Sequence, residues 1–209
     1  MTSSVPTAVL LASGGLDSTT LAFWLRERRI SFLLLFIDYG QHCAETELKR
    51  LNEVLPKETF GEVKIINVSD IYRGSHSRLI SEPNLWEDHV SAEDMYLPYR
   101  NLLLLSIASA YAQSNGISDV YTAFINSNHA KEIDCSAEFF QRLETMLADY
   151  GSVKIKMPFR EKSKQEVAEI GLRLKAPIAR TFSCQAASKV PCGACPNCVD
   201  RLEALKLLD

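Results

Sequence analysis

The feature that most constrains this chain is a glycine-rich turn that directly follows a short apolar segment near the N-terminus. Residues 7–12 form the apolar segment, and Ser13-Gly14-Gly15-Leu16-Asp17-Ser18 forms the turn. Residues 19–28 continue with apolar side chains at helical spacing. A strand, a glycine turn and a helix in this order direct backbone N–H groups and a helix dipole at one point, which suits a phosphate group. A Gly-Gly turn with a Ser/Asp helix cap is the simpler interpretation, and these residues alone leave it open.

The rest of the chain alternates strand-like and helix-like segments. We predict further strands at 31–38, 63–68, 119–124 and 153–157, and helices at 45–55, 102–115, 136–150 and 163–174. Ser163 and Glu166 predict a capping box at the start of the last of these helices. Residues 70–97 show no sustained period, so we expect a loop or a mobile flap there. The alternation predicts an α/β fold with a doubly wound parallel sheet.

Charge and composition exclude several functional classes. The net charge is −3, from 23 basic and 26 acidic side chains, which disfavours a surface that tracks a long nucleic acid. Apolar runs such as 33–37 and 102–105 are too short to cross a bilayer, and residues 1–7 lack the basic start of a signal peptide. We therefore expect a cytoplasmic protein with no membrane contact.

A cysteine cluster near the C-terminus is the second strong feature. Cys184, Cys192, Cys195 and Cys198 offer four thiolates in a short stretch, and in a reducing compartment such a set favours a metal over disulfides. Four thiolates suit a tetrahedral structural zinc ion and leave no open coordination position. An iron–sulfur cluster or a redox Cys-x2-Cys pair are the alternatives. We predict a main domain over residues 1–180 and a zinc-binding segment over 181–209.

The turn at 13–18 resembles the signature of the PP-loop, or N-type ATP pyrophosphatase, superfamily. Asp38-Tyr39-Gly40-Gln41, which follows the second predicted strand, strengthens this resemblance. It implies an adenine nucleotide alpha hydrolase-like fold whose loop binds the pyrophosphate end of ATP, and an enzyme that transfers AMP to a substrate oxygen. Asp17 is suited to hold Mg²⁺ there. The ATP-binding residues would be Ser13, Gly14, Gly15, Leu16, Asp17, Ser18, Thr19, Asp38 and Gln41.

Further motifs resemble one family of this superfamily, QueC, over nearly the whole chain. Leu97-Pro98-Tyr99-Arg100-Asn101 resembles its VPGRN motif, and Asp134-Cys135 resembles part of its substrate segment. Thr181-x2-Cys184 and the stretch from Cys192 to Arg201 resemble its C-terminal cysteine pattern. On residue type alone, Arg201 itself is more typical of a surface charge than of a ligand contact.

The resemblance implies an ATP-dependent carbon–nitrogen ligase. It would convert 7-carboxy-7-deazaguanine, of the queuosine pathway, to the amide and then to the nitrile with ammonia, as a homodimer. Its catalytic residues would be Asp17, Arg100 and Lys164; Lys164 begins a helix, where a cation opposes the dipole unless it serves an anion. Its substrate would contact Arg100, Asn101, Asn128, Asp134 and Cys135. His42 and His129 are weaker acid–base candidates.

The chain departs from the family pattern in the substrate half. Asn128 replaces an aspartate, Glu132-Ile133 replaces Tyr-Pro, Ser136 replaces an arginine, and Gln185 replaces a tyrosine. These changes are typical of a diverged paralogue, and some such paralogues lie in antiviral defence gene clusters. One chemistry for such a paralogue stops at an amide that joins the deazaguanine carboxylate to a protein amine. The sequence leaves nitrile and protein-linked amide as open alternatives.

Three other functions compete with this interpretation. A zinc-tailed nucleotide- or RNA-binding module without catalysis would keep ATP binding only. A tRNA sulfur transferase would use Cys43 or Cys135, but the acidic balance opposes it and a lone cysteine is more often a small buried hydrophobe. A ligase of the asparagine- or NAD-synthetase type would leave the cysteine cluster and the motif at 97–101 unexplained.

Overall fold

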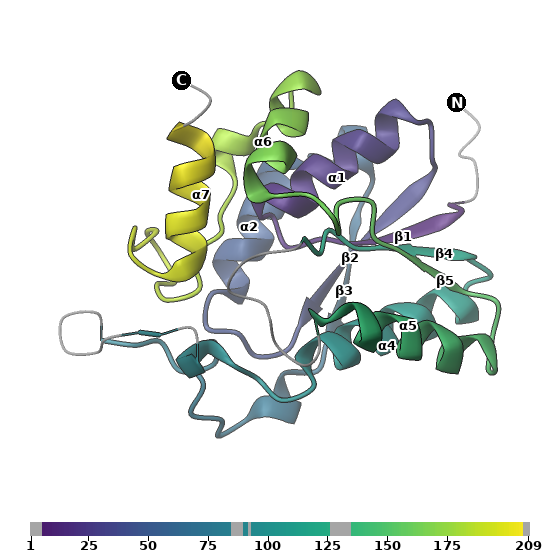
Figure 1. Ribbon diagram of the computed structural model, residues 1–209, viewed down its shortest axis with the longest axis horizontal. Coiled ribbons are helices and arrows are strands. Elements are labelled where there is room, and N and C mark those ends of the chain that lie inside the picture. The colour runs from purple at the N-terminus through teal and green to yellow at the C-terminus, as the bar shows by residue number, and fades with distance from the viewer. Residues whose placement is uncertain (1–5, 85–89, 92, 126–134, 207–209) are drawn as a thin grey trace.

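Five parallel strands form a single sheet at the centre of the molecule (Figure 1). The computed structural model describes residues 6–84, 90–91, 93–125 and 135–206. The strand order is β3-β2-β1-β4-β5, and every neighbouring pair is parallel. The strands are β1 (Ala8–Leu11), β2 (Phe32–Asp38), β3 (Val63–Asn67), β4 (Asp119–Tyr121) and β5 (Lys154–Lys156). The predicted doubly wound α/β fold is therefore confirmed.

Helices cover both faces of this sheet (Figure 1). One face carries α1 (Leu16–Glu27), α2 (Ala44–Val54), α6 (Lys164–Arg173) and α7 (Pro196–Lys206); the other carries α4 (Arg100–Ser114) and α5 (Ala137–Ala148). The short α3 (Lys57–Phe60) precedes β3, and 3-10 turns lie at Ser69–Tyr72, Glu93–Met95 and Ile178–Arg180. Each predicted helix and strand is present in the structure.

Strand β1 is apolar throughout and β2 is apolar up to Asp38, because both faces of these strands are buried. Leu10 of β1 and Leu34 of β2 pack towards α1 and α6, whereas Val9 and Leu35 pack towards α4. These residues have no exposed surface. Burial on two sides explains why β1 and β2 are continuous apolar runs, whereas the edge strand β5 alternates between exposed lysines and buried Ile155.

The strand order creates a crevice between β1 and β4. The chain proceeds from β1 outward through β2 and β3, and then returns to place β4 on the other side of β1. At such a reversal of strand order, the loops that follow the two neighbouring strands run to opposite faces of the sheet. Ligands of sheets of this type bind in the resulting crevice, beyond the carboxyl ends of the strands. The Gly-rich turn after β1 lies at this position.

Three local predictions are refined by the structure. Helix α1 begins at Leu16, its N-cap is Gly15 and no side chain caps it, so Asp17 is not a helix cap. Strand β4 ends at Tyr121. Within the described part of 70–97, Leu79, Met95 and Leu97 are buried in a cluster with Tyr39, so these three residues pack on the domain. The predicted capping box of Ser163 and Glu166 is present.

No helix among the described residues is both long and apolar enough to span a membrane.

Gly14 is the point where the turn after β1 touches helix α2. Its φ is +72°, and a Cβ built on it would lie 2.7 Å from the Leu51 nitrogen and 2.8 Å from the Glu47 carbonyl oxygen. Both neighbours are backbone atoms of α2, which cannot move without moving the helix. Glycine is therefore required at this position for conformation and for space.

Substitution of Gly14 separates these two requirements. Gly116 has a similar φ of +68°, but nothing lies within 4 Å of the corresponding Cβ. We expect Gly116→Ala to lower the free energy of unfolding by about 1 kcal/mol, the cost of a left-handed alanine. Gly14→Ala should lower the free energy of unfolding by roughly 2 kcal/mol more than Gly116→Ala does, because its Cβ clashes with α2. Chemical denaturation of both variants measures the difference, and equal losses would contradict the close contact.

Candidate nucleotide site and cysteine cluster

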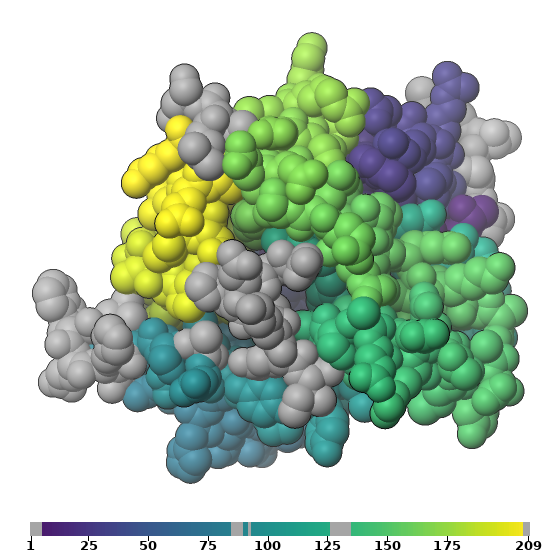
Figure 2. Space-filling model, in the orientation of Figure 1, coloured from purple at the N-terminus to yellow at the C-terminus, as the bar shows by residue number. Residues whose placement is uncertain are grey.

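A cavity of about 270 Å³ lies at the carboxyl ends of β1, β2 and β4. Residues from the turn after β1, from the segment after β2, from the start of α4 and from Thr122 to Phe124 after β4 line it. Figure 2 shows a hollow at the centre of the face that carries the light-green residues of α6 and the yellow C-terminal segment. The cavity thus occupies the crevice that the strand order creates.

The turn after β1 supplies one wall of the cavity. Ser13, Gly15, Asp17 and Ser18 line it, and the Ser13 N–H donates to Ser18 Oγ at 3.3 Å. Of the other predicted ATP-binding residues, Gly14 packs on α2, the Leu16 side chain lies in the core, and Thr19 has no exposed surface. Neither Leu16 nor Thr19 lines the cavity, and the Thr19 N–H donates to the Gly15 carbonyl oxygen at 3.1 Å.

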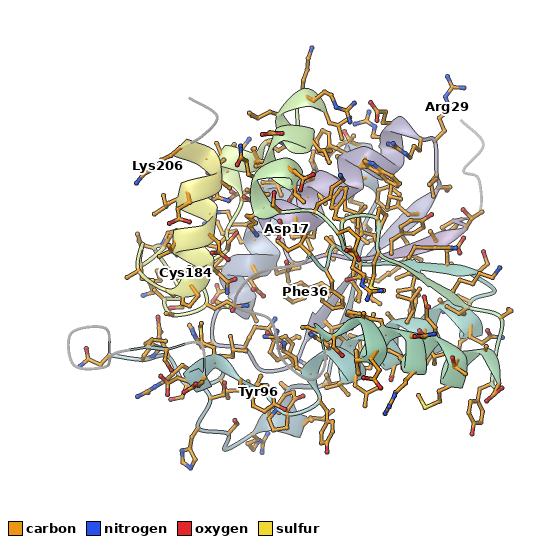
Figure 3. All side chains as sticks on the ribbon, in the orientation of Figure 1. Asp17, Arg29, Phe36, Tyr96, Cys184 and Lys206 are labelled. Carbon is orange, nitrogen blue, oxygen red and sulfur yellow. The ribbon has the colours of Figure 1, made fainter. Side chains whose placement is uncertain are left out.

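Asp17 and Lys164, separated by most of the sequence, form an ion pair beside this wall. Lys164 Nζ lies 2.5 Å from Asp17 Oδ2, and both side chains are mostly buried. Figure 3 places Asp17 at the start of α1, and Asp17 and Phe36 of β2 both line the cavity. Asp17 Oδ1 is buried and has no hydrogen-bond partner in the described part of the chain. A buried, unpartnered carboxylate oxygen fits a ligand to Mg²⁺, which prefers carboxylates together with phosphates.

The opposite wall carries Tyr39, Gln41, Glu47 and Arg100. Gln41 joins the segment after β2 to α2: its Oε1 accepts from the Tyr39 N–H at 2.9 Å, and its Nε2 donates to Glu47 Oε2 at 3.0 Å. Asp38 shapes the turn before it, because its carboxylate accepts from the Gly40 N–H and from Asn67 Nδ2. Arg100 begins α4 and is the cation of this wall.

Burial changes the acidity of groups on this wall. Desolvation raises the pKa of Glu47 to about 7, although hydrogen bonds from Gln41 and Cys43 and the charge of Arg100 oppose the change. Desolvation likewise raises the pKa of the Tyr39 phenol, with Arg100 opposing it, and the pKa of the Cys43 thiol. Tyr39 and Cys43 therefore stay neutral at physiological pH, whereas Glu47 titrates near it.

The predicted substrate residues are described only in part. Asn101 is buried, lines the cavity and donates to Cys135 Sγ at 2.8 Å, so the structure brings these two together. Asn128, Asp134 and His129 lie outside the described residues. Ser136 caps α5 by accepting from the Phe139 N–H. Gln185 lines the cavity, and its side-chain oxygen accepts from Asn197.

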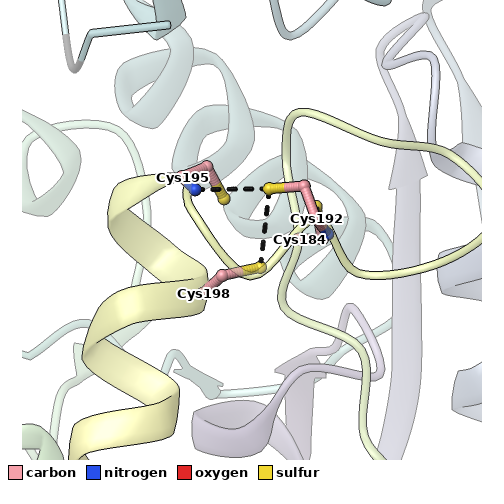
Figure 4. A group of neighbouring side chains, drawn as sticks. All are labelled: Cys184, Cys192, Cys195 and Cys198. Atoms are coloured by element: carbon pink, nitrogen blue, oxygen red, sulfur yellow. Dashed lines mark hydrogen bonds between the residues drawn. The ribbon is translucent and has the colours of Figure 1, made fainter. Parts of the chain in front are cut away.

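The four clustered cysteines meet at one point (Figure 4). The Sγ atoms of Cys184, Cys192, Cys195 and Cys198 all lie within 4.8 Å of one another, and Cys192 and Cys198 are 4.0 Å apart. Sulfurs around a tetrahedral zinc ion lie about 3.8 Å apart, so the cluster fits zinc. Hydrogen bonds from Cys184 and Cys198 lower the pKa of Cys195 to about 3, which favours the thiolate. Hydrogen bonds with Cys184 and Cys195 raise the pKa of Cys198.

The cysteine segment is tied directly to the turn after β1. The Phe182 N–H, two residues before Cys184, donates to the Gly14 carbonyl oxygen at 3.0 Å. Arg201, after the last cysteine, donates to Thr181 Oγ1 and to the carbonyls of Ile178 at 2.9 Å and Ala179 at 3.1 Å. The expectation that Arg201 is a surface charge is wrong, because its guanidinium fastens α7 to the segment that leads to the cluster.

Glu47, Phe36 and Phe124 are among the lining residues of the cavity that the sequence did not indicate. Glu47 lies among several acids of an amphipathic helix, so its type and spacing resemble those of solvent-exposed neighbours such as Glu45. Phe36 and Phe124 read as ordinary core residues of strands. The one available signal for Glu47 was its closeness to Gln41, six positions earlier.

Comparisons with known proteins place the chain in a family. The family model described as queuosine biosynthesis protein QueC matches residues 7–209. The chain belongs to the QueC family. The 7-cyano-7-deazaguanine synthase of Methanospirillum hungatei is 34% identical over 95% of this chain and 94% of its own length. The 7-cyano-7-deazaguanine synthase 1 of Desulfitobacterium hafniense is 32% identical over 95% and 91%.

A solved structure supports the fold of this QueC-family chain. A predicted subunit of tRNA methyltransferase from Methanocaldococcus jannaschii covers 80% of this chain and 76% of its own, with a TM-score of 0.53 and 14% identity. At this identity the likeness concerns the fold alone. It agrees with the parallel, doubly wound sheet described above.

The contact between Phe182 and Gly14 predicts that zinc supports the nucleotide site. We expect one zinc ion per chain, and its loss in Cys184→Ser should lower Tm by about 5 °C or more, roughly 2 kcal/mol for a chain of this size. The increase in Tm that ATP and Mg²⁺ produce should also become smaller when zinc is lost. Metal analysis and thermal shift measure both effects, with Cys135→Ser as the control that keeps zinc. Undiminished ATP stabilisation in zinc-free protein would contradict this coupling.

Proposed function

We propose that this QueC-family protein is an ATP-dependent carbon–nitrogen ligase that acts on 7-carboxy-7-deazaguanine. It would adenylate the carboxylate, release pyrophosphate and transfer nitrogen to the acyl carbon to give the amide and AMP. A second ATP would adenylate the amide oxygen, and loss of that oxygen with AMP would give 7-cyano-7-deazaguanine. The relatives named above are 7-cyano-7-deazaguanine synthases and match nearly the full chain. The observation that carries the proposal is a phosphate loop in the crevice between β1 and β4, with cations from α4 and α6 beside it.

The residues of the cavity suit the adenylation step. A carboxylate oxygen attacks the α-phosphorus of ATP, the bond from that phosphorus to the β-phosphate bridging oxygen breaks, and pyrophosphate leaves with the electron pair. Backbone N–H groups of the turn after β1, together with Arg100 and Lys164, would stabilise the negative charge on the pyrophosphate. Asp17 would hold Mg²⁺, an ion that neutralises phosphate charge when bound.

The remaining residues would form the substrate half. Asn101, Arg100 and Cys135 lie at or beside the cavity and would contact the deazapurine or its carboxylate, together with Asn128 and Asp134. Arg100 is suited to a carboxylate because its planar guanidinium can donate two parallel hydrogen bonds. The amine would come from free ammonia or from a protein amine, and we propose that the protein acts as a homodimer.

A protein-linked amide remains the second candidate product. The observation that favours it is Ser136, which replaces an arginine of the family pattern and caps α5. A neutral serine at this position would alter recognition of an anionic substrate. In this variant of the proposal, a protein amine takes the place of ammonia and the reaction stops at the amide, as in an antiviral paralogue.

The products distinguish these functions. We expect zinc-loaded protein with ATP, Mg²⁺, 7-carboxy-7-deazaguanine and ammonium to release pyrophosphate and AMP, and mass spectrometry to find the nitrile. Accumulation of adenylate or amide without nitrile would favour the protein-linked amide. No pyrophosphate with this substrate would contradict the deazaguanine assignment, and ATP binding without turnover under all conditions would indicate a nucleotide-binding module without catalysis.

Replacement of Asp17 tests the ATP half of the proposal. Asp17→Asn removes the charge that would hold Mg²⁺ but keeps the side-chain size, so we expect pyrophosphate release to fall at least about 100-fold. Asp149→Asn, at the exposed end of α5, is the matched control and should keep the wild-type rate. Pyrophosphate release is measured with a coupled assay, and turnover by the Asp17 variant would remove Asp17 from the mechanism.

A further inference from the structure

Glu47 is a cavity carboxylate to which the adenylation step gives no role. It is the fourth residue of α2, and its backbone carbonyl lies against Gly14, so its position is fixed with respect to the phosphate loop. Its side chain lines the same cavity as Asp17 and Arg100. Among the described residues, the carboxylates that line this cavity are Asp17 and Glu47.

The two carboxylates have different surroundings. Asp17 is paired with Lys164. Glu47 accepts hydrogen bonds from the neutral Gln41 amide and the neutral Cys43 thiol, and within the described ranges it forms no ion pair. The charged groups that face it are Arg100 from α4, which is attractive, and Asp38 from the end of β2, which is repulsive. A carboxylate has about four acceptor positions, so two neutral donors leave capacity for a further donor.

A purely structural role does not account for the charge. A glutamine at position 47 could accept the same hydrogen bond from Gln41 and would fill the same volume. It would also avoid the desolvation that raises the pKa of the carboxyl group to about 7. Glu47 is a carboxylate in a cavity, it is desolvated, and it has no cationic partner in hydrogen-bond contact. Such a carboxylate is typical of a group that binds a cation or accepts a proton.

We propose that Glu47 binds the ammonium form of the nitrogen donor and accepts a proton from it before the nitrogen attacks the adenylate. This inference rests on the proposed function and assigns a residue to its second half. Ammonium is a hydrogen-bond donor and a cation, and it is the reactant that a carboxylate recognises in a cavity otherwise suited to anions. An alkylammonium group of a protein would be recognised in the same way.

The step balances as follows for ammonium. One proton passes from the nitrogen to a Glu47 carboxylate oxygen, which leaves ammonia with a lone pair. The lone pair forms the C–N bond to the acyl carbon of the adenylate. The bond from that carbon to the AMP oxygen breaks, and AMP leaves with the electron pair. A second proton goes from the new C–N nitrogen to water, which gives the neutral amide.

The acidity of Glu47 agrees with this assignment. A pKa of about 7 means that the group exchanges its proton readily near neutral pH, the condition under which general bases are most effective. The proton-accepting form is the ionised one, so amide formation should rise with pH through this value. Below it, Glu47 is protonated and cannot accept a proton from ammonium.

The test compares Glu47→Gln, Glu47→Asp and Glu45→Gln in the full-length protein. Carboxylate-dependent exchange of pyrophosphate with ATP reports adenylation, and amide formation with ammonium reports the second half. We expect Glu47→Gln to keep the exchange rate within about threefold but to lose at least about 100-fold in amide formation at about pH 7. The difference in amide formation between Glu47→Gln and the wild type should become smaller at alkaline pH, because free ammonia needs no base.

The two further variants control for folding and for charge. Glu47→Asp keeps a carboxylate and should recover part of the amide rate. Glu45 is exposed on the same helix, so Glu45→Gln should match the wild type in pyrophosphate exchange and in amide formation. An amide rate for Glu47→Gln equal to wild type at all pH values would overturn the inference. So would a loss of exchange as large as the loss of amide formation, because Glu47 would then serve ATP or the deazapurine.

Failure of the proposed function gives a different result. If the wild-type protein shows no exchange with 7-carboxy-7-deazaguanine, the proposed function is wrong and the role of Glu47 falls with it. If the wild type exchanges and forms amide while Glu47→Gln does the same, only the inference about Glu47 is wrong.

Discussion

The backbone contacts of Gly14 determine where three distant parts of the chain meet. Helix α2 lies against its Cα on one side, and its carbonyl oxygen accepts from the Phe182 N–H on another. The turn after β1 therefore has a fixed relation to Glu47 on α2 and to the cysteine segment that follows Phe182. A small displacement of any one of these elements would move the N–H groups that a phosphate requires, so the nucleotide site depends on packing as much as on its own sequence.

The sequence predicts those features whose residue type and spacing are distinctive. The turn at 13–18, the apolar runs of β1 and β2 and the spacing of the four cysteines each have few alternative explanations, and the structure contains the fold and the cysteine cluster that they indicate. The pairing of Lys164 with Asp17 depends on how α6 packs against α1, and no local pattern encodes it. Arg201 was misread for a related reason, because the carbonyls it binds become neighbours only when α7 folds back.

Glu47 illustrates the same limit within one helix. Glu45 and Glu47 have the same residue type and lie two positions apart, but a helix turns them to different faces, so one is exposed and the other lines the cavity. Asp17 and Glu47 then differ in chemistry because of their neighbours. Asp17 forms an ion pair with Lys164, whereas desolvation raises the pKa of Glu47 to about 7 against the opposing effect of its neutral hydrogen-bond donors. Pairs of carboxylates with such different environments can perform different tasks in one site.

The cysteine segment completes this arrangement without a large core of its own. Its buried cluster consists mainly of cysteines, small residues and Phe182, and apolar burial of that size stabilises a segment only weakly. Four thiolates around one metal ion would supply the missing free energy, since metal-binding energy becomes folding energy where the site forms only in the folded state. The segment also brings Gln185 to the cavity and Phe182 to Gly14. A metal bound there would take no part in the chemistry but would still affect nucleotide binding, because it would fix the segment whose Phe182 N–H donates to Gly14 in the turn after β1.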